Sequence, residues 1–278
     1  MLTTDRSIGV TPLSPNIGAE ISGIDLTKPL SAQQVQELQD ALTRHLVIFF
    51  RDQQIDNAAQ KALGMHFGEL HRSVGGDVTH SKALAEDPVV RKFHFDEHST
   101  AVSGEVWHTD QSCAAIPPMG SILYLHTVPP NGGGDTMFAS MYAAYDALTP
   151  RMKAYMTGLT ATHDGGRVFE RTADNIPPVS THPLVAVHPV TGRKLIYFTG
   201  AVVTRINELT EGESASLISF LTDHCAHPNF QIRFRWQPHS IAFWDNRCAH
   251  HRAIWDYHPH TRSGYRIQIK GTAPPIPA

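Results

Sequence analysis

The sequence predicts a mainly β fold with flanking helices, a sandwich or barrel formed as a single domain over residues 1–278. Three observations predict it. Short runs rich in β-branched and aromatic residues recur along the chain, glycine and proline separate them, and few segments have helical periodicity. The nine clearest runs are 21–26, 46–50, 121–128, 136–139, 184–188, 194–198, 231–236, 241–244 and 264–270.

Two capping signals place the main helices between these runs. Ser31 followed by Gln34, and Thr210 followed by Glu213, have the spacing of a capping box, and apolar residues at helical intervals follow each pair. Weaker helical patterns cover 57–67 and 142–156, and Pro150 interrupts the second of these.

Composition narrows the class of protein further. The formal net charge is -3, so the chain lacks the basic excess expected for nucleic-acid or anionic-membrane binding. Its three cysteines are odd in number and show no C-x-x-C spacing, which argues against a disulfide framework or a thiolate metal site. The first fifteen or so residues have no signal-peptide pattern. We therefore expect a cytoplasmic protein.

Two long stretches have no clear secondary-structure pattern. Residues 71–105 are polar and end just before a His-x-Asp motif, and residues 162–183 are similar in character. Long irregular segments in compact domains are often functional lids. We predict lid loops at 71–105 and 162–183. The glycine-rich segment 131–135 is expected to be a tight turn, because no P-loop lysine follows it.

The chemistry-bearing motif is formed by His108 and Asp110, two positions apart. On an extended chain such side chains project from the same face. A distant histidine, either His250 or His251, would complete the two-histidine-one-carboxylate triad of non-haem Fe(II) oxygenases. Arg262 then supplies a rigid cationic fork suited to a carboxylate. Together these residues indicate Fe(II), a keto-acid cosubstrate and O2.

Two other readings use the same residues. A catalytically silent β-barrel would keep the fold without needing the complete set of groups. A zinc hydrolase could use the same three ligands but has no need of Arg262 or Thr136. Dependence on added 2-oxoglutarate separates an oxygenase from both.

Further motifs accompany the triad along nearly the whole chain. They include IGVTPL at 8–13, GAEISGIDL at 18–26, VIFFRDQ at 47–53, WHTD at 107–110, GGDT at 133–136, HPLV at 182–185, TRI at 204–206 and WDNR at 244–247. In this combination the chain resembles the taurine dioxygenase superfamily of Fe(II)/2-oxoglutarate-dependent dioxygenases. That superfamily also contains alkylsulfatases and aryloxyalkanoate herbicide dioxygenases.

The resemblance implies a double-stranded β-helix (jelly-roll) core and a role for each matching residue. His108, Asp110 and His251 match the iron ligands, with His250 expected to point outward. Arg262 and Thr136 match the residues that bind the distal carboxylate of 2-oxoglutarate. Arg266 matches an arginine that meets an anionic substrate group or assists the cosubstrate, with a purely structural ion pair as its alternative.

The implied reaction is hydroxylation of an aliphatic C–H bond, with release of succinate and CO2. Substrate-pocket positions depart from taurine dioxygenase, because Ser73, Gly104, Gly165 and Val202 replace larger or more polar residues. We therefore expect a small organic substrate larger than taurine, and anionic because Arg266 remains. The alternative is cleavage of a sulfonate, alkyl sulfate or aryloxyalkanoate through an unstable hydroxylated product. Self-association into a homo-oligomer is also expected, without a nucleic-acid or membrane partner.

Overall fold

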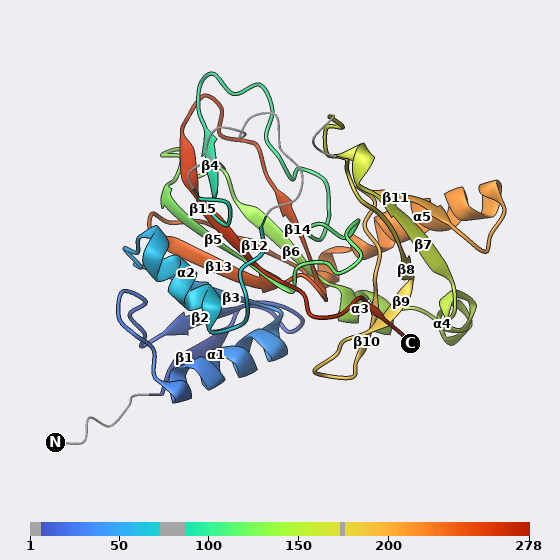
Figure 1. The fold of residues 1–278 in the computed structure, drawn as a ribbon, viewed down its shortest axis with the longest axis horizontal. Coiled ribbons are helices and arrows are strands. Elements are labelled where there is room, and N and C mark those ends of the chain that lie inside the picture. The colour runs from blue at the N-terminus through green and yellow to red at the C-terminus, as the bar shows by residue number, and fades with distance from the viewer. Residues whose placement is uncertain (1–6, 73–86, 173–175) are drawn as a thin grey trace.

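The largest sheet of the protein has seven strands (Figure 1). The computed structural model describes residues 7–72, 87–172 and 176–278. Seven strands pair in the order β1-β2-β3-β13-β5-β15-β4, with β2 and β3 parallel and the other neighbours antiparallel. Their bounds are β1 Gly9–Pro12, β2 Ala19–Ser22, β3 Val47–Phe50, β4 Arg91–Phe95, β5 Gly120–Thr127, β13 Ser240–Asp245 and β15 Arg262–Ile269.

A second, three-stranded sheet packs against one face of the first. It has the order β12-β6-β14, with β6 at Thr136–Ser140, β12 at Gln231–Phe234 and β14 at Ala249–Ala253. Phe49 of the large sheet stacks on Phe234 at 3.9 Å between ring centroids and meets Phe138 edge-on at 5.5 Å. Burying each such ring contributes about 1.5–3 kcal/mol. Two sheets facing each other across this core form the predicted jelly roll.

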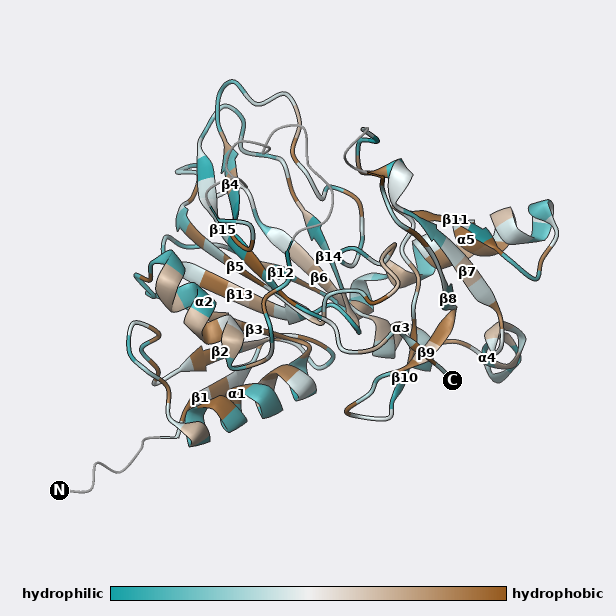
Figure 2. Ribbon diagram, in the orientation of Figure 1, coloured by the Kyte–Doolittle hydropathy of each residue, from teal (hydrophilic) through white to brown (hydrophobic). Residues whose placement is uncertain are grey.

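Helices α1 (Ala32–His45) and α2 (Asn57–Met65) cover the opposite face of the large sheet (Figures 1 and 2). Leu38 and Leu63 lie in one buried cluster with the sheet residues Phe50 and Ile122. The predicted capping box of α1 is present, because the Ser31 hydroxyl accepts from the Gln34 amide at 3.2 Å, while the Gln34 side chain accepts from the Ser31 amide at 3.0 Å. The helices thus bury the outer face of the sheet.

The remaining elements lie beside the jelly roll (Figure 1). In the predicted helical segment 142–156, Pro150 starts a new helix at its first turn, so two helices form. Within the described ranges no helix is both long and apolar enough to cross a membrane. The elements are α3 Met141–Asp146, α4 Pro150–Met156, β7 Thr160–Asp164, η2 Gly165–Arg167, β8 Val179–Pro183, β9 Val185–Val187, β10 Lys194–Ile196, β11 Val203–Ile206, α5 Glu211–Cys225, η3 Pro228–Phe230 and β16 Ile276–Pro277.

Each of the nine predicted β runs overlaps a strand, although run 21–26 shares only two residues with β2, and the predicted helices form. The expectation that 71–105 and 162–183 lack regular structure is wrong in part. The first contains β4, paired with β15, and the second contains the end of β7 and all of β8, which pair with each other. Both segments are polar because these strands are only partly buried. The strands that the patterning missed are β1, β4, β7, β8, β11, β14 and β16.

Candidate active site

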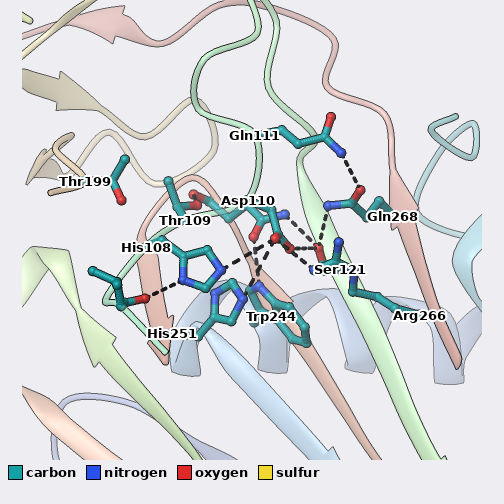
Figure 3. Close-up of polar contacts among 12 residues, drawn as sticks. His108, Thr109, Asp110, Gln111, Ser121, Thr199, Trp244, His251, Arg266 and Gln268 are labelled. Atoms are coloured by element: carbon teal, nitrogen blue, oxygen red, sulfur yellow. Dashed lines mark hydrogen bonds and ion pairs between the residues drawn. The ribbon is translucent and has the colours of Figure 1, made fainter. Parts of the chain in front are cut away.

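Three polar side chains from distant parts of the chain meet beside β14 (Figure 3). Each of His108, Asp110 and His251 offers one ligand atom, and the three atoms lie within 4.8 Å of one another. Two backbone hydrogen bonds hold His108 next to His251. The His108 amide donates to the His251 carbonyl at 3.1 Å, and the His251 amide donates to the His108 carbonyl at 2.8 Å. The His108–Asp110 segment is therefore an isolated bridge followed by a turn rather than the extended strand expected from the motif.

The two imidazoles are held in the form that can bind a metal. His108 Nδ1 donates to the Val106 carbonyl at 2.7 Å, so in the neutral ring Nε2 carries the lone pair. That Nε2 and the Nε2 of His251 each lie 3.9 Å from Asp110 Oδ1. Burial lowers the pKa of both histidines, which favours the neutral ligand form.

Asp110 is anchored through both of its carboxylate oxygens. The Ser121 hydroxyl donates to Oδ2 at 2.6 Å, and Arg266 Nη1 donates to Oδ1 at 2.9 Å. Burial raises the pKa of this carboxyl. The charge of Arg266, the neighbouring His251 and His108 imidazoles and the Ser121 hydrogen bond outweigh the effect of burial, so the pKa lies well below its ordinary value. Asp110 is an anion at every physiological pH.

These groups fit a divalent iron ion on chemical grounds. Two neutral imidazoles and one carboxylate, all from one side, are the donor set that binds Fe(II) and leaves positions open. The structure also places a cation, the Arg266 guanidinium, against the carboxylate oxygen that faces both histidines. His251 Nδ1 has no hydrogen-bond partner among the described residues, and its ring packs 4.6 Å from the Trp244 ring.

His250, the alternative third ligand, faces the other side of β14. It was expected to point outward, but its side chain is buried, near the Phe198 backbone. The expectation was wrong because β14 is covered on both faces. Burial, and then the charge of His108, lower the pKa of His250 to about 3. Strand alternation thus places His251, and not His250, beside His108 and Asp110.

A second buried group, the Arg262 pocket, lies between β15 and β6. Arg262 Nε donates to the Gly134 carbonyl at 2.9 Å and Nη2 to the Thr136 hydroxyl at 3.4 Å. That hydroxyl also accepts from Trp236 Nε1 at 3.0 Å. Arg262 is 4 % exposed and Thr136 is equally buried, so the guanidinium is held in place at the protein interior. This arrangement presents a fixed cation to an anionic group.

One cavity of about 440 Å³ is lined by His108, Asp110 and His251 and also by Arg262 and Thr136. That volume lies within the usual range for small-molecule sites. Most of its wall is apolar. The wall includes Phe93, Phe95, Val102, Leu123, Phe169, Val202 and Trp244.

The predicted substrate residues have different positions relative to this cavity. Gly104 and Val202 line it, whereas Ser73 lies outside the described residues. Gly104 has φ +89°, and a Cβ there would lie 3.1 Å from His108 Cε1, so a larger residue would be strained. Gly165 does not border the cavity. This corrects the prediction, because a side chain at this position would point toward the Pro178 carbonyl and Cys113 Sγ instead, 2.8 Å and 3.0 Å from its Cβ.

A polar chain that sequence reasoning missed links Asp110 through Ser121 and Gln268 to Gln111 (Figure 3). The Ser121 hydroxyl accepts from Asn246 Nδ2 at 3.0 Å and from Gln268 Nε2 at 3.3 Å. Gln111 Nε2 donates to Gln268 Oε1 at 2.9 Å. No motif marks Ser121, Gln111 or Gln268, whereas Asn246 belongs to the WDNR motif. Only strand register brings them together, since Gln268 lies opposite Ser121 in the β15–β5 pair.

Another group of three residues could hold a metal ion by proximity alone: His188, Asp245 and Cys248. Its polar atoms are already engaged. Arg247 binds both oxygens of Asp245, at 2.8 Å and 2.6 Å, and His188 donates to the same carboxylate at 3.0 Å. Backbone amides occupy His188 Nδ1. The hydrogen bonds and the ion pair of this group stabilise the turn between β13 and β14.

The jelly roll and the triad define the class of non-haem iron dioxygenases. The family model described as "Taurine catabolism dioxygenase TauD, TfdA family" matches residues 9–268, and the chain belongs to this family. It is therefore an Fe(II)- and 2-oxoglutarate-dependent dioxygenase that uses O2.

The similarity to known proteins covers nearly the whole chain. An α-ketoglutarate-dependent (2-oxoglutarate-dependent) sulfonate dioxygenase of Saccharomyces cerevisiae is 34% identical, over 95% of this chain and 67% of the relative. A sulfate ester dioxygenase of Pseudomonas putida, also α-ketoglutarate-dependent, is 31% identical over 96% and 91%. The crystal structure of a taurine dioxygenase from Burkholderia xenovorans has a TM-score of 0.83 at 35% identity, covering 97% of this chain and 93% of that one.

Proposed function

We propose that this enzyme hydroxylates an aliphatic C–H bond of a small anionic organic substrate larger than taurine, releasing succinate and CO2. The observation that carries the proposal is the convergence of the three ligand atoms within 4.8 Å, in the same cavity as the buried Arg262. A zinc hydrolase or a silent barrel would have no use for that arginine.

In this proposal His108, Asp110 and His251 hold Fe(II). The bound iron supplies the oxidising chemistry with O2 and the 2-oxo acid. The protein's own part is to fix the donor atoms. The Val106 carbonyl orients His108, while Ser121 holds the second oxygen of Asp110 and limits that carboxylate to one ligand atom. The apolar wall around Trp244 keeps the site dry.

Arg262 and Thr136 bind the distal carboxylate of 2-oxoglutarate. A guanidinium forms charge-assisted hydrogen bonds to a carboxylate, and the threonine hydroxyl can add one more. Gly134 and Trp236 keep both groups in place before the cosubstrate arrives. Such preorganisation lowers the entropy lost on binding.

The substrate occupies the rest of the cavity, near Arg266. The described parts of both proposed lids, 71–105 and 162–183, contribute to its wall through Val102 and Phe169. We propose that these segments close over the substrate and exclude water. The exclusion of water would protect the reactive centre from side reactions.

Succinate release on a panel of anions tests the proposed function. The panel contains taurine, longer alkanesulfonates, alkyl sulfates and aryloxyacetates, each at several concentrations. We expect at least one larger anion to stimulate succinate release well above taurine. Turnover of taurine equal to the best of the panel would contradict the proposed substrate size. Absence of any dependence on 2-oxoglutarate would contradict the proposed reaction.

The relatives named for sulfonates and sulfate esters favour a second outcome of the same chemistry. A hydroxyl placed on the carbon beside a sulfonate or sulfate oxygen gives an unstable product that breaks apart. In that case the panel yields sulfite or sulfate together with an aldehyde. A stable hydroxylated product would argue for simple hydroxylation.

A further inference from the structure

A chain of hydrogen bonds through two glutamines connects the half-buried His71 to Asp110 (Figure 3). His71 Nε2 lies 2.9 Å from Gln111 Oε1, and Gln111 Nε2 donates to Gln268 Oε1 at 2.9 Å. Gln268 Nε2 then donates to the Ser121 hydroxyl at 3.3 Å, and this hydroxyl donates to Asp110 Oδ2 at 2.6 Å. Four hydrogen bonds therefore separate His71 from the proposed metal ligand.

The charge of Asp110 fixes the direction of every bond in this chain. An ionised carboxylate can only accept, so the single Ser121 proton lies between the two oxygens. Gln268 must then turn its NH2 group to Ser121 and its carbonyl to Gln111. Gln111 in turn offers its carbonyl to His71, whose ring donates through Nε2. All four bonds point toward Asp110, and bonds in such a chain polarise one another.

The Ser121 hydroxyl has no spare position to turn to. It donates to Asp110 and accepts from Asn246 Nδ2 at 3.0 Å and from Gln268, which uses its proton and both of its lone pairs. Ser121 is 0% exposed and Gln268 3%. If the hydroxyl rotated, its proton would face an amide NH2 group and leave a buried donor unsatisfied. The two amides therefore hold this proton on Asp110 Oδ2.

The backbone at Gln111 is strained, directly after the proposed metal ligand. Its φ is +49°, in the left-handed region that few residues other than glycine adopt. Neighbouring side chains on an extended strand point to opposite faces, whereas here Asp110 and Gln111 both join one chain of hydrogen bonds. Such strain persists where the surrounding structure holds it, and it is concentrated at functional sites. This turn is what brings Gln111 into contact with Gln268.

We propose that Gln268 is a positioning residue for Asp110. It keeps the Ser121 proton on Oδ2, so that only Oδ1, the oxygen that faces both proposed histidine ligands, is directed at the metal. A carboxylate can bind a metal ion through one oxygen or through both. A second oxygen would take one of the positions that the 2-oxo acid and O2 require. The inference rests on the proposed function, because it takes Asp110 as a metal ligand.

Mn(II) binding to the metal-free protein tests this inference without turnover. Calorimetry measures the Kd of Mn(II), and the relaxation of water protons reports how many water molecules the bound ion keeps. Urea unfolding of the metal-free protein measures stability separately. His108→Ala shows how large an effect the loss of a proposed ligand has.

Gln268→Met removes the amide and keeps the length of the side chain. We expect the Kd of Mn(II) to rise about three- to tenfold, less than the ten- to hundredfold typical of a direct partner of a ligand. We also expect a smaller relaxation enhancement, because the freed second oxygen of Asp110 replaces a bound water.

Gln53→Met is the matched control. Gln53 is also a buried glutamine, whose side chain accepts from the Leu26 amide at 2.8 Å and donates to the Arg51 carbonyl at 2.9 Å. It does not line the cavity. We expect this change to lower the urea midpoint and to leave both the Kd and the relaxation enhancement of Mn(II) unaltered.

Gln111→Gly is a second variant, at a position whose backbone suits glycine. It removes the donor to Gln268 Oε1, so the Kd of Mn(II) should rise in the same direction by a smaller factor. If Gln268→Met fails to fold, this variant decides the question, and a wild-type Kd would then refute the inference.

The outcomes separate this inference from the proposed function. If His108→Ala weakens Mn(II) binding but Gln268→Met and Gln53→Met have the same Kd and relaxation enhancement, the positioning role of Gln268 is refuted while the proposed metal site stands. If the wild type does not bind Mn(II), or His108→Ala binds it equally well, both the proposed metal site and the role of Gln268 are overturned.

Discussion

Ser121 connects the buried polar chain to Asp110, a proposed metal ligand, and the effect of replacing it by alanine can be calculated. Its hydroxyl donates to Asp110 and accepts from Asn246 and Gln268, and the residue is fully buried. A hydrogen bond to a charged group contributes about 1.5–3 kcal/mol, and each neutral one about 0.5–1.5 kcal/mol. Ser121→Ala should therefore lower the free energy of unfolding by about 2.5–6 kcal/mol.

The same change should weaken metal binding. Loss of a hydrogen-bonding partner of a metal ligand typically reduces metal affinity by about ten- to a hundredfold. Urea unfolding measures the first effect, and calorimetric titration with Mn(II) measures the second. A domain of ordinary stability, about 5–15 kcal/mol, would remain folded in most of this range.

Ser263→Ala provides the matched control. Ser263 is also buried on the large sheet, but among the described residues its hydroxyl forms one hydrogen bond of ordinary strength, with His94 Nδ1 at 3.2 Å. We expect it to lower the unfolding free energy by about 1 kcal/mol and to leave Mn(II) affinity unchanged. Equal effects of the two substitutions on both measurements would refute the assigned role of Ser121.

Three further predictions concern single residues. Burial lowers the pKa of His163 to about 3, so the folded protein binds this proton only below that pH, whereas the unfolded chain binds it below about 6.5. The unfolding free energy therefore decreases as the pH falls from about 6.5 to about 3. His163→Gln should reduce the slope of unfolding free energy against pH by about 1.4 kcal/mol per unit between about pH 6 and 4. An unchanged slope would contradict this prediction. Arg247→Leu removes the guanidinium that binds both oxygens of the buried Asp245 carboxylate, and should lower the unfolding free energy by about 3–5 kcal/mol in urea titrations. A loss below about 1 kcal/mol would refute the stabilising role of this ion pair. Arg262→Gln should raise the Kd of 2-oxoglutarate at least about tenfold in calorimetry, while an unaltered Kd would remove Arg262 from the cosubstrate site.

The sequence predicted much of this fold because its central strands have a strong pattern. Runs such as 121–128 and 241–244 are apolar and β-branched, and they form the buried middle of the large sheet. The helix around Leu38 could be placed because Ser31 and Gln34 mark its start. Strand β14 lacked such a signal, since its histidines and arginine break the apolar pattern. His251 was therefore predicted as the third metal ligand from family spacing rather than from secondary structure.

The substrate side of the site was harder to predict from sequence. The predicted substrate residues were chosen because they match pocket positions of taurine dioxygenase, and their small size implied an open pocket. They are Ser73, Gly104, Gly165 and Val202. In the structure, Phe93 and Phe95 of β4 instead form an aromatic part of the cavity wall. Which side chains face a cavity depends on strand register and loop path, and neither can be deduced from local sequence. The Gln111–Gln268 contact was unpredictable for the same reason.

The most direct test of the proposed active site is an anaerobic titration of metal-free protein with Fe(II) and 2-oxoglutarate, followed by visible absorption. The site as proposed predicts the weak charge-transfer band that arises when a 2-oxo acid binds Fe(II). It also predicts that His108→Ala and Arg262→Ala abolish or weaken the band, while Lys92→Gln retains it. Iron-replete wild-type protein that develops no band would contradict the assigned cosubstrate site.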